Sequence, residues 1–405
     1  MSKYTSKTEK FLITSSLLNK TTGGSKDISA NIENIAIQND YLENSFPLFV
    51  IGLKGTKELI DEIQFNSVKI YLKISSFIQD DTDMKEDDSD IAVNDVLFET
   101  TIRCYDKPVR KLNSSADVDK EETDNDLDNS AAFVKYQISG IPENLIEKNK
   151  TIINEVFEQA SMNEILVNIF SSVDNNELYI EDSNNKIREK SLLIPPLNLV
   201  QTVRYLQDFY GIYEDNLCLY FDINKTYIYS LNNEKKIYDK TFSIELKETK
   251  KSADTLMYNR PLFNSDGDMM MYLKNITTFS SQKEIIDDNL GNETIFYSYD
   301  DEFNLNIRKK TDSEIFEKVR YYWNENQTKI KEESFYNSLK KSKAIAFIFN
   351  NISPTYFKPN TKFLINGNDS IINGEYALIE NSVLFSTSDF KQYTSDNSLK
   401  LIKIK

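Results

Sequence analysis

The stretch that most constrains the fold runs from residue 192 to residue 230, where a helical pattern is followed directly by a strand pattern. Pro195 and Pro196 prevent a helix from forming before them, because proline lacks a backbone N–H. Behind them, a helix near 198–210 is predicted by apolar side chains that recur on one face, namely Leu199, Val203, Leu206 and Tyr210. Gly211 stands where a left-handed residue ends a helix.

A hairpin and a second helix complete this region. Residues 217–221 alternate as a strand does, and a turn at 222–225 leads into a partner strand. A helix near 161–172 is predicted because Ser161 and Glu164 form a capping-box pattern in front of an apolar face. Residues 146–235 are therefore predicted to form a small α+β domain whose role is packing, with no chemistry of its own.

Strand patterns dominate the chain before residue 146. The clearest covers 68–75, where apolar and polar side chains alternate as in a half-buried strand. Further strands are predicted at 10–13, 46–53, 96–105 and 133–138. The segment 28–37 fits either a helix or a strand, and that alternative stays open. Five or six strands with little helix predict a small sandwich or barrel over 1–145.

Two acidic segments interrupt these strands. Residues 80–90 and 117–128 each carry seven acids and one lysine, and together they supply −12 of the formal net charge of −16. Both are predicted to be solvated loops, because segments with so few apolar side chains cannot offset the entropy of ordering by burial. The second segment does not fit a calcium loop, since Glu122 stands where such a loop requires glycine.

Strand patterns return after residue 236. They predict a second β-rich domain over 236–405, with strands at 241–246, 269–272, 276–279, 294–299, 344–349, 362–365, 376–379, 383–385 and 399–404. A polar insert near 283–342 separates the early strands from the late ones. Within this insert, the patterns at 315–323 and 334–341 favour helices.

Composition excludes several kinds of site. The chain has no histidine, which rules out histidine-based catalysis and histidine-ligated zinc. Its two cysteines, Cys104 and Cys218, fall in different predicted domains, so two free thiols are expected rather than a disulfide. Phosphate-binding and dinucleotide-binding motifs are lacking as well. We therefore predict no catalytic, cofactor-binding or metal residues, no cofactor and no enzymatic activity.

The sequence also bears on location. No apolar run approaches the 18 residues or so of a membrane-spanning helix, and no secretory leader follows Met1. Lys and Arg are not clustered over the surface as nucleic-acid binding requires. We expect a soluble protein made in a cytoplasm.

The central region resembles the middle domain of the tail hub proteins found in baseplates of contractile-tailed bacteriophages. The residues that carry this resemblance are Ile194-Pro195-Pro196, Val203, Tyr205-Leu206, Tyr210-Gly211, Tyr213, Leu219-Tyr220-Phe221-Asp222 and Thr226-Tyr227. The order Pro359-Asn360-Thr361-Lys362-Phe363, then Gly374-Glu375-Tyr376, is similar to the end of the second barrel of such hubs. The acidic loops and the insert near 283–342 have no match in that pattern.

The resemblance implies a mainly β, α+β fold: two tube-like β-barrel domains, over 1–145 and 236–405, flank the α+β domain over 146–235. It also implies a homotrimeric ring in the virion baseplate that joins a hexameric tail tube to a trimeric spike. The partners would be the tail tube protein, the spike or other baseplate proteins, with DNA only as cargo through the lumen.

Two other functions remain open. A secreted or surface carbohydrate-binding β-protein would suit the many aromatic side chains, although such a protein would carry a signal peptide. A regulatory interaction protein would suit the acidic loops. The particle size separates these alternatives, because a hub forms rings or trimers whereas the other two are expected to be monomers.

Overall fold

The computed structural model describes the chain in many ordered segments, and the fold is built mainly of strands. The described residues are 5–6, 9–18, 24–42, 44–56, 58–59, 69–78, 95–104, 109–110, 134–173, 177–183, 188–213, 217–231, 236–248, 261–263, 269–273, 277–280, 295–299, 305–309, 320–321, 329–330, 343–367, 372–389 and 392–404. Three α-helices have their bounds described, all between residues 143 and 209, and residues 58–59 are helical as well. The predicted mainly β, α+β class is confirmed.

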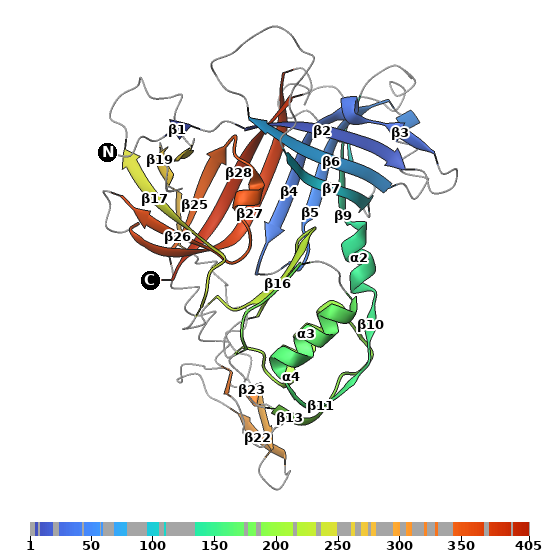
Figure 1. Ribbon diagram of the computed structural model, residues 1–405, viewed down its shortest axis with the longest axis vertical. Helices are drawn as coiled ribbons and strands as arrows, with labels where there is room; N and C mark the ends of the chain where they lie inside the picture. Colours follow the sequence, from blue (N-terminus) through green and yellow to red (C-terminus); the bar gives the residue numbers. More distant parts are fainter. Residues whose placement is uncertain are drawn as a thin grey trace.

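A closed antiparallel β-barrel of eight strands forms the first lobe of the molecule (Figure 1). In order around the barrel, the strands are β2 (Glu9–Leu18), β6 (Lys69–Ile78), β7 (Asp95–Cys104), β9 (Val134–Pro142), β5 (Leu48–Gly55), β4 (Ile32–Asp40), β27 (Gly374–Asp389) and β28 (Gln392–Lys403). Short elements adjoin them: β3 (Ser25–Asp27), the 3-10 turn η1 (Ser29–Asn31) and β8 (Val109–Arg110). Residues 28–37, for which helix and strand were both left open, thus form a short 3-10 turn followed by the start of strand β4.

The barrel is filled with side chains. Along β2 the buried and less buried positions alternate without a break, as expected for a strand with one face on a core. Phe11, Phe49, Ile74 and Phe385 are among the side chains that meet inside, and each is at most 1% exposed. A barrel of this size closes on its own side chains, so its interior is a packed core and not a channel.

The α+β unit lies below the barrel in Figure 1 and contains all three helices. Its elements are α2 (Glu143–Asn149), β10 (Ile152–Ile153), β11 (Val156–Ser161), α3 (Met162–Val173), β12 (Glu177–Ile180), β13 (Arg188–Leu193), β14 (Leu197–Asn198), α4 (Leu199–Phe209), β15 (Cys218–Phe221) and β16 (Lys225–Tyr229). The predicted hairpin is confirmed, because β15 pairs antiparallel with β16. Strand β12 extends that sheet by pairing parallel with β16.

The two helices predicted in the α+β unit, near 161–172 and 198–210, are confirmed as α3 and α4. Their caps explain where they begin. Ser161 and Glu164 form the predicted capping box of α3. Helix α4 has a second capping box, which the sequence analysis missed, between Asn198 and Gln201. At the other end, Gly211 has φ 76°, the left-handed conformation expected of a helix terminator.

A second sheet forms the remaining lobe. It comprises β1 (Thr5–Ser6), β17 (Lys240–Glu248), β18 (Pro261–Phe263), β19 (Met269–Leu273), β20 (Thr277–Ser280), β25 (Lys343–Asn350) and β26 (Thr361–Asn366), together with β27 and β28. The 3-10 turn η4 (Pro354–Tyr356) leads into β26. The core of this second sheet is rich in aromatic rings, and the ring of Phe357 contacts those of Phe349 and Phe363.

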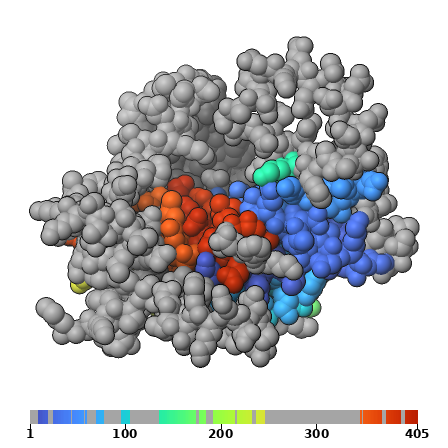
Figure 2. Space-filling model, turned by 90° about the horizontal axis from the view of Figure 1, so that it is seen from above, coloured from blue at the N-terminus to red at the C-terminus, as the bar shows by residue number. Residues whose placement is uncertain are grey.

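Strands β27 and β28 belong to both lobes. Near its start β27 pairs with β26, and after a β-bulge between Leu378 and Glu380 it pairs with β4 of the barrel. A bulge bends and twists a strand, which allows one strand to leave one sheet and enter another. Figure 2 shows the result: the red C-terminal strands lie directly against the blue N-terminal strands.

The described part of the polar insert agrees with the strand predicted at 294–299 and differs from the prediction at 320–321. Its described residues are strands, in two small hairpins: β21 (Ile295–Tyr299) with β22 (Leu305–Lys309), and β23 (Arg320–Tyr321) with β24 (Lys329–Ile330). The predicted helix at 315–323 is therefore wrong at 320–321, because helical spacing in a short window does not exclude a strand. The rest of that helix, the helix at 334–341 and both acidic loops lie outside the described residues.

Candidate functional site

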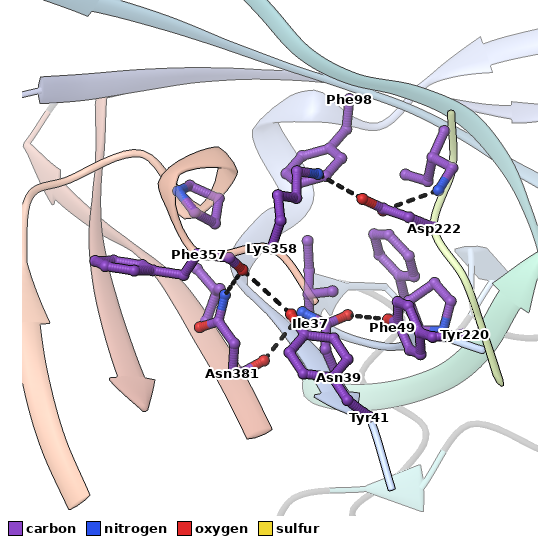
Figure 3. A pocket seen from close by; sticks show the side chains of 14 residues that line it. Ile37, Asn39, Tyr41, Phe49, Phe98, Tyr220, Asp222, Phe357, Lys358 and Asn381 are labelled. Carbon is purple, nitrogen blue, oxygen red and sulfur yellow. Dashed lines mark hydrogen bonds and ion pairs between the residues drawn. The ribbon is translucent and has the colours of Figure 1, made fainter. Parts of the chain in front are cut away.

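A small cavity lies where the barrel, the α+β unit and the second sheet meet (Figure 3). Its walls come from β4, from β15 and the turn after it, from residues 354–358 and from β27. The cavity volume is about 20 Å³. That is room for about one water molecule and not for a substrate. The site is therefore a joint between structural units.

A chain of hydrogen bonds crosses this joint. The Tyr41 hydroxyl and the Asn381 side-chain amide each donate to the Phe357 carbonyl at 3.2 Å. The Tyr220 hydroxyl donates to the Asn39 side chain at 2.6 Å, and the Asn39 amide donates to the Asn381 carbonyl at 3.0 Å. The bonds thus link β4 to the α+β unit, to β27 and to the segment before β26.

Two tyrosine rings pack against each other at the joint. The rings of Tyr41 and Tyr220 meet edge to face, with their centroids 4.8 Å apart, and both side chains are buried. Burial raises the pKa of Tyr41 well above its usual value, and the negative charge of Asp222 adds to the effect. Burial likewise raises the pKa of Tyr220. Both hydroxyls therefore stay protonated and act as hydrogen-bond donors, not as bases.

An ion pair stands at the rim of the cavity. The Lys358 ammonium lies 2.5 Å from the Asp222 carboxylate, and their side chains are 35% and 14% exposed. A pair this open to water contributes little to stability, on the order of 1 kcal/mol or less. Its contribution is to fix the turn after β15 against the segment before β26.

A second joint holds helix α2 against the outside of the barrel. Glu143 of α2 pairs with Lys69 of β6 and, at 2.5 Å, with Arg103 of β7. Arg103 also reaches Glu147 at 2.7 Å. Burial alone would raise the pKa of Glu143, but its bonds to Lys69 and Arg103 outweigh that effect and lower it. The helix that leaves the barrel is thus fixed in direction by charges on two strands.

A third joint ties the α+β unit to the start of the second sheet. Lys236 and Glu181 form an ion pair at 2.9 Å, with side chains 4% and 6% exposed. Lys236 also donates to the Ser230 carbonyl and lies 4.6 Å from the ring centre of Tyr229. Burial lowers the pKa of Lys236, while the Glu181 charge opposes that shift. Separating the two side chains would leave an unpaired buried charge, which is costly. The ion pair therefore holds the segment between β16 and β17 in place.

The described residues offer no second kind of site. No group of three or more His, Cys, Asp or Glu among them could hold a metal ion. Cys104 and Cys218 are both free, as predicted, and burial raises the pKa of Cys104 to about 12. None of the described helices has the length and apolarity to span a bilayer.

Of the residues at these joints, sequence reasoning singled out only Tyr220 and Asp222, as members of the central stretch. Asn39, Tyr41, Lys358 and Asn381 stand in ordinary strand or loop patterns, and they come together only because distant segments are neighbours in the fold. The one local signal was the stretch around Tyr220, which was singled out as a packing unit.

Three comparisons place the chain among known proteins. No curated protein matches it. Among solved structures it is similar to a tail protein from Neisseria meningitidis MC58, with 8% identity, 97% of each chain covered and a TM-score of 0.49. It is also similar to the 43 kDa tail protein of prophage MuSo2 from Shewanella oneidensis, with 9% identity, 96% of each chain covered and a TM-score of 0.44.

A further similar structure is a prophage tail protein from Listeria monocytogenes EGD-e, with 11% identity, coverage of 96% of this chain and 94% of that chain, and a TM-score of 0.39. The family comparison covers more of the sequence itself, since the model described as bacteriophage PBS1 gene 109 protein matches residues 5–404. The chain therefore belongs to the bacteriophage PBS1 gene 109 protein family, and the phage affiliation predicted from the sequence is confirmed.

Proposed function

We propose that this phage protein is a structural component of the virion tail and, more specifically, the hub of a baseplate. In this proposal three copies form a ring, and the ring joins a hexameric tail tube to a trimeric spike. The partners are the tail tube protein, the spike and other baseplate proteins. The location is the baseplate of the virion, after synthesis in the host cytoplasm.

The observation that carries the proposal is the pairing of two strand-rich lobes within one chain. The barrel and the second sheet lie side by side and share β27 and β28. Three chains would therefore present six strand-rich lobes, which is the number needed to face a hexameric tube. The division into domains at 1–145, 146–235 and 236–405 belongs to the same proposal. In it, the hairpin of β27 and β28 extends from the third domain into the barrel of the first.

The packed barrel core also bears on the path proposed for DNA. Because Phe11, Phe49 and Phe385 fill the barrel, DNA would pass through the opening of the ring and not through a single barrel. The proposed role is non-enzymatic. The joints are consistent with a rigid structural protein, since their polar groups bond to one another and connect the structural units.

Measurement of the assembly tests the proposal. Light scattering and negative-stain microscopy of the purified protein should give homotrimers and ring-shaped particles. Antibody labelling of purified virions should place the protein at the end of the tail. A strictly monomeric protein at tens of micromolar that is also absent from purified virions would refute it.

A further inference from the structure

The barrel is completed by strands from the far end of the chain. Strand β28 pairs with β2, where Phe11 opposes Tyr393, and β27 pairs with β4, where Ile37 opposes Val383. The strands β2 and β4 do not pair with each other. Without the C-terminal hairpin, the other six strands would leave a slot bounded by two unpaired strand edges. Such edges are sites of aggregation.

The half of the hairpin beyond the bulge also supplies part of the barrel core. Val383, Phe385 and Tyr393 are each at most 3% exposed and pack in the barrel cluster. The rings of Phe11 and Phe385 meet edge to face at 5.1 Å. The Tyr393 hydroxyl donates to the Ile32 carbonyl at 2.8 Å. Removing this half would therefore expose apolar side chains as well as strand edges.

The other half of the hairpin is anchored in the second sheet. Tyr376, Leu378 and Leu401 are buried in the aromatic core there. Just before the start of β27, the Asn373 side chain accepts a hydrogen bond from the Gly367 N–H at 2.6 Å and donates one to the Gly367 carbonyl at 3.1 Å. The hairpin thus projects from one lobe into the slot of the other.

Closing the slot joins residues that are far apart in the chain. Asn39 and Asn381 are 342 positions apart, and Tyr393 and Ile32 are 361 apart, whereas Tyr71 and Glu99 on neighbouring strands β6 and β7 are only 28 apart. The entropy cost of closing a loop rises with its length, so local strand pairs are expected to form before long-range ones.

We propose that the part of the hairpin that enters the barrel, residues 380–389 and 392–395, is a locking tongue that closes the barrel in the last and slowest step of folding. Before this step the chain has neither a finished barrel nor a fixed arrangement of its two lobes. After it, one hairpin holds both lobes. The chain can then present its lobes to an assembly only once the hairpin of β27 and β28 has been made and docked. The inference concerns folding and stands independently of the proposed hub role.

A reversible covalent link in the full chain tests the order of events. Gln38 and Ser382 oppose each other across β4 and β27, and both side chains avoid the barrel core. The double variant Gln38→Cys/Ser382→Cys is refolded from denaturant in oxidised and reduced form, and mass spectrometry verifies the bond. Because the link closes the long loop in advance, the oxidised form should refold about tenfold faster or more.

The matched control is Tyr71→Cys/Thr101→Cys, which links the local pair β6 and β7 at opposed positions. Its two forms should refold within about twofold of each other, because that pair forms before the slow step. Equal rates for the tongue pair, or equal acceleration by both pairs, would overturn the proposal.

Pulsed hydrogen exchange on the unaltered chain gives a second measurement that needs no variant. Amides that join β6 to β7 should gain protection early in refolding, and amides that join β4 to β27 and β2 to β28 should gain it last. Simultaneous protection of both sets would contradict the tongue as the final step.

Discussion

Truncation of Leu206 is the sharpest test of how the α+β unit is held together. Leu206 lies on α4, is 0% exposed and belongs to the core that α4 shares with α3 and β15. Leu206→Ala removes three carbons, worth about 2.4 kcal/mol of burial at ~0.8 kcal/mol per carbon. A residual cavity adds to this loss, so the total should be about 2–5 kcal/mol.

The matched control lies one turn further along the same helix. Phe209 is 53% exposed, and its ring lies 4.7 Å from that of Tyr205. Phe209→Ala should cost less than about 1 kcal/mol, as surface changes usually do. Both helical substitutions introduce alanine, the best helix former, so helix propensity cannot explain a loss of stability.

Native-state hydrogen exchange of the α4 amides is the appropriate assay, because a chain with several structural units does not have to unfold in one step. The opening free energy of α4 should fall for Leu206→Ala and stay near wild type for Phe209→Ala. If the two variants behave alike, or in the reverse order, the buried face of α4 has been assigned wrongly.

Three further predictions concern the joints and the loops. Tyr41→Phe should lower stability by about 1 kcal/mol in urea unfolding, because it removes one of two donors to the Phe357 carbonyl. Glu143 has a lowered pKa, so its contribution is present above its usual value of 4.5 and is lost as pH falls through the folded-state value; Glu143→Gln should therefore flatten the acid limb of a stability profile. Replacement of 80–90 and 117–128 by short Gly-Ser linkers should leave folding and solubility unchanged, and an insoluble product would contradict this sequence-based prediction.

The local elements could be read from the sequence because short-range physics decides them. The stripe Leu199, Val203 and Leu206 is buried as its spacing required, and Gly211 ends the helix as its freedom at positive φ allows. The alternation around 68–75 marked β6, where Ile70, Leu72 and Ile74 are buried. The two free cysteines likewise followed from their wide separation in the sequence.

Strand pairing, in contrast, was decided only by the tertiary structure. Alternation says which face of a strand is buried, but it does not say which strand lies beside it, and β27 finds β4 more than 300 positions away. The joint of Tyr41, Tyr220, Phe357 and Asn381 depends on that pairing, so no local pattern could indicate it. The sequence by itself thus determined helices α3 and α4 and, for strands such as β6, which face is buried. The long-range pairing of β27 and β28, which closes the barrel and joins the lobes, was decided by the tertiary structure, because the contacts that stabilise it exist only when both ends of the chain are in place.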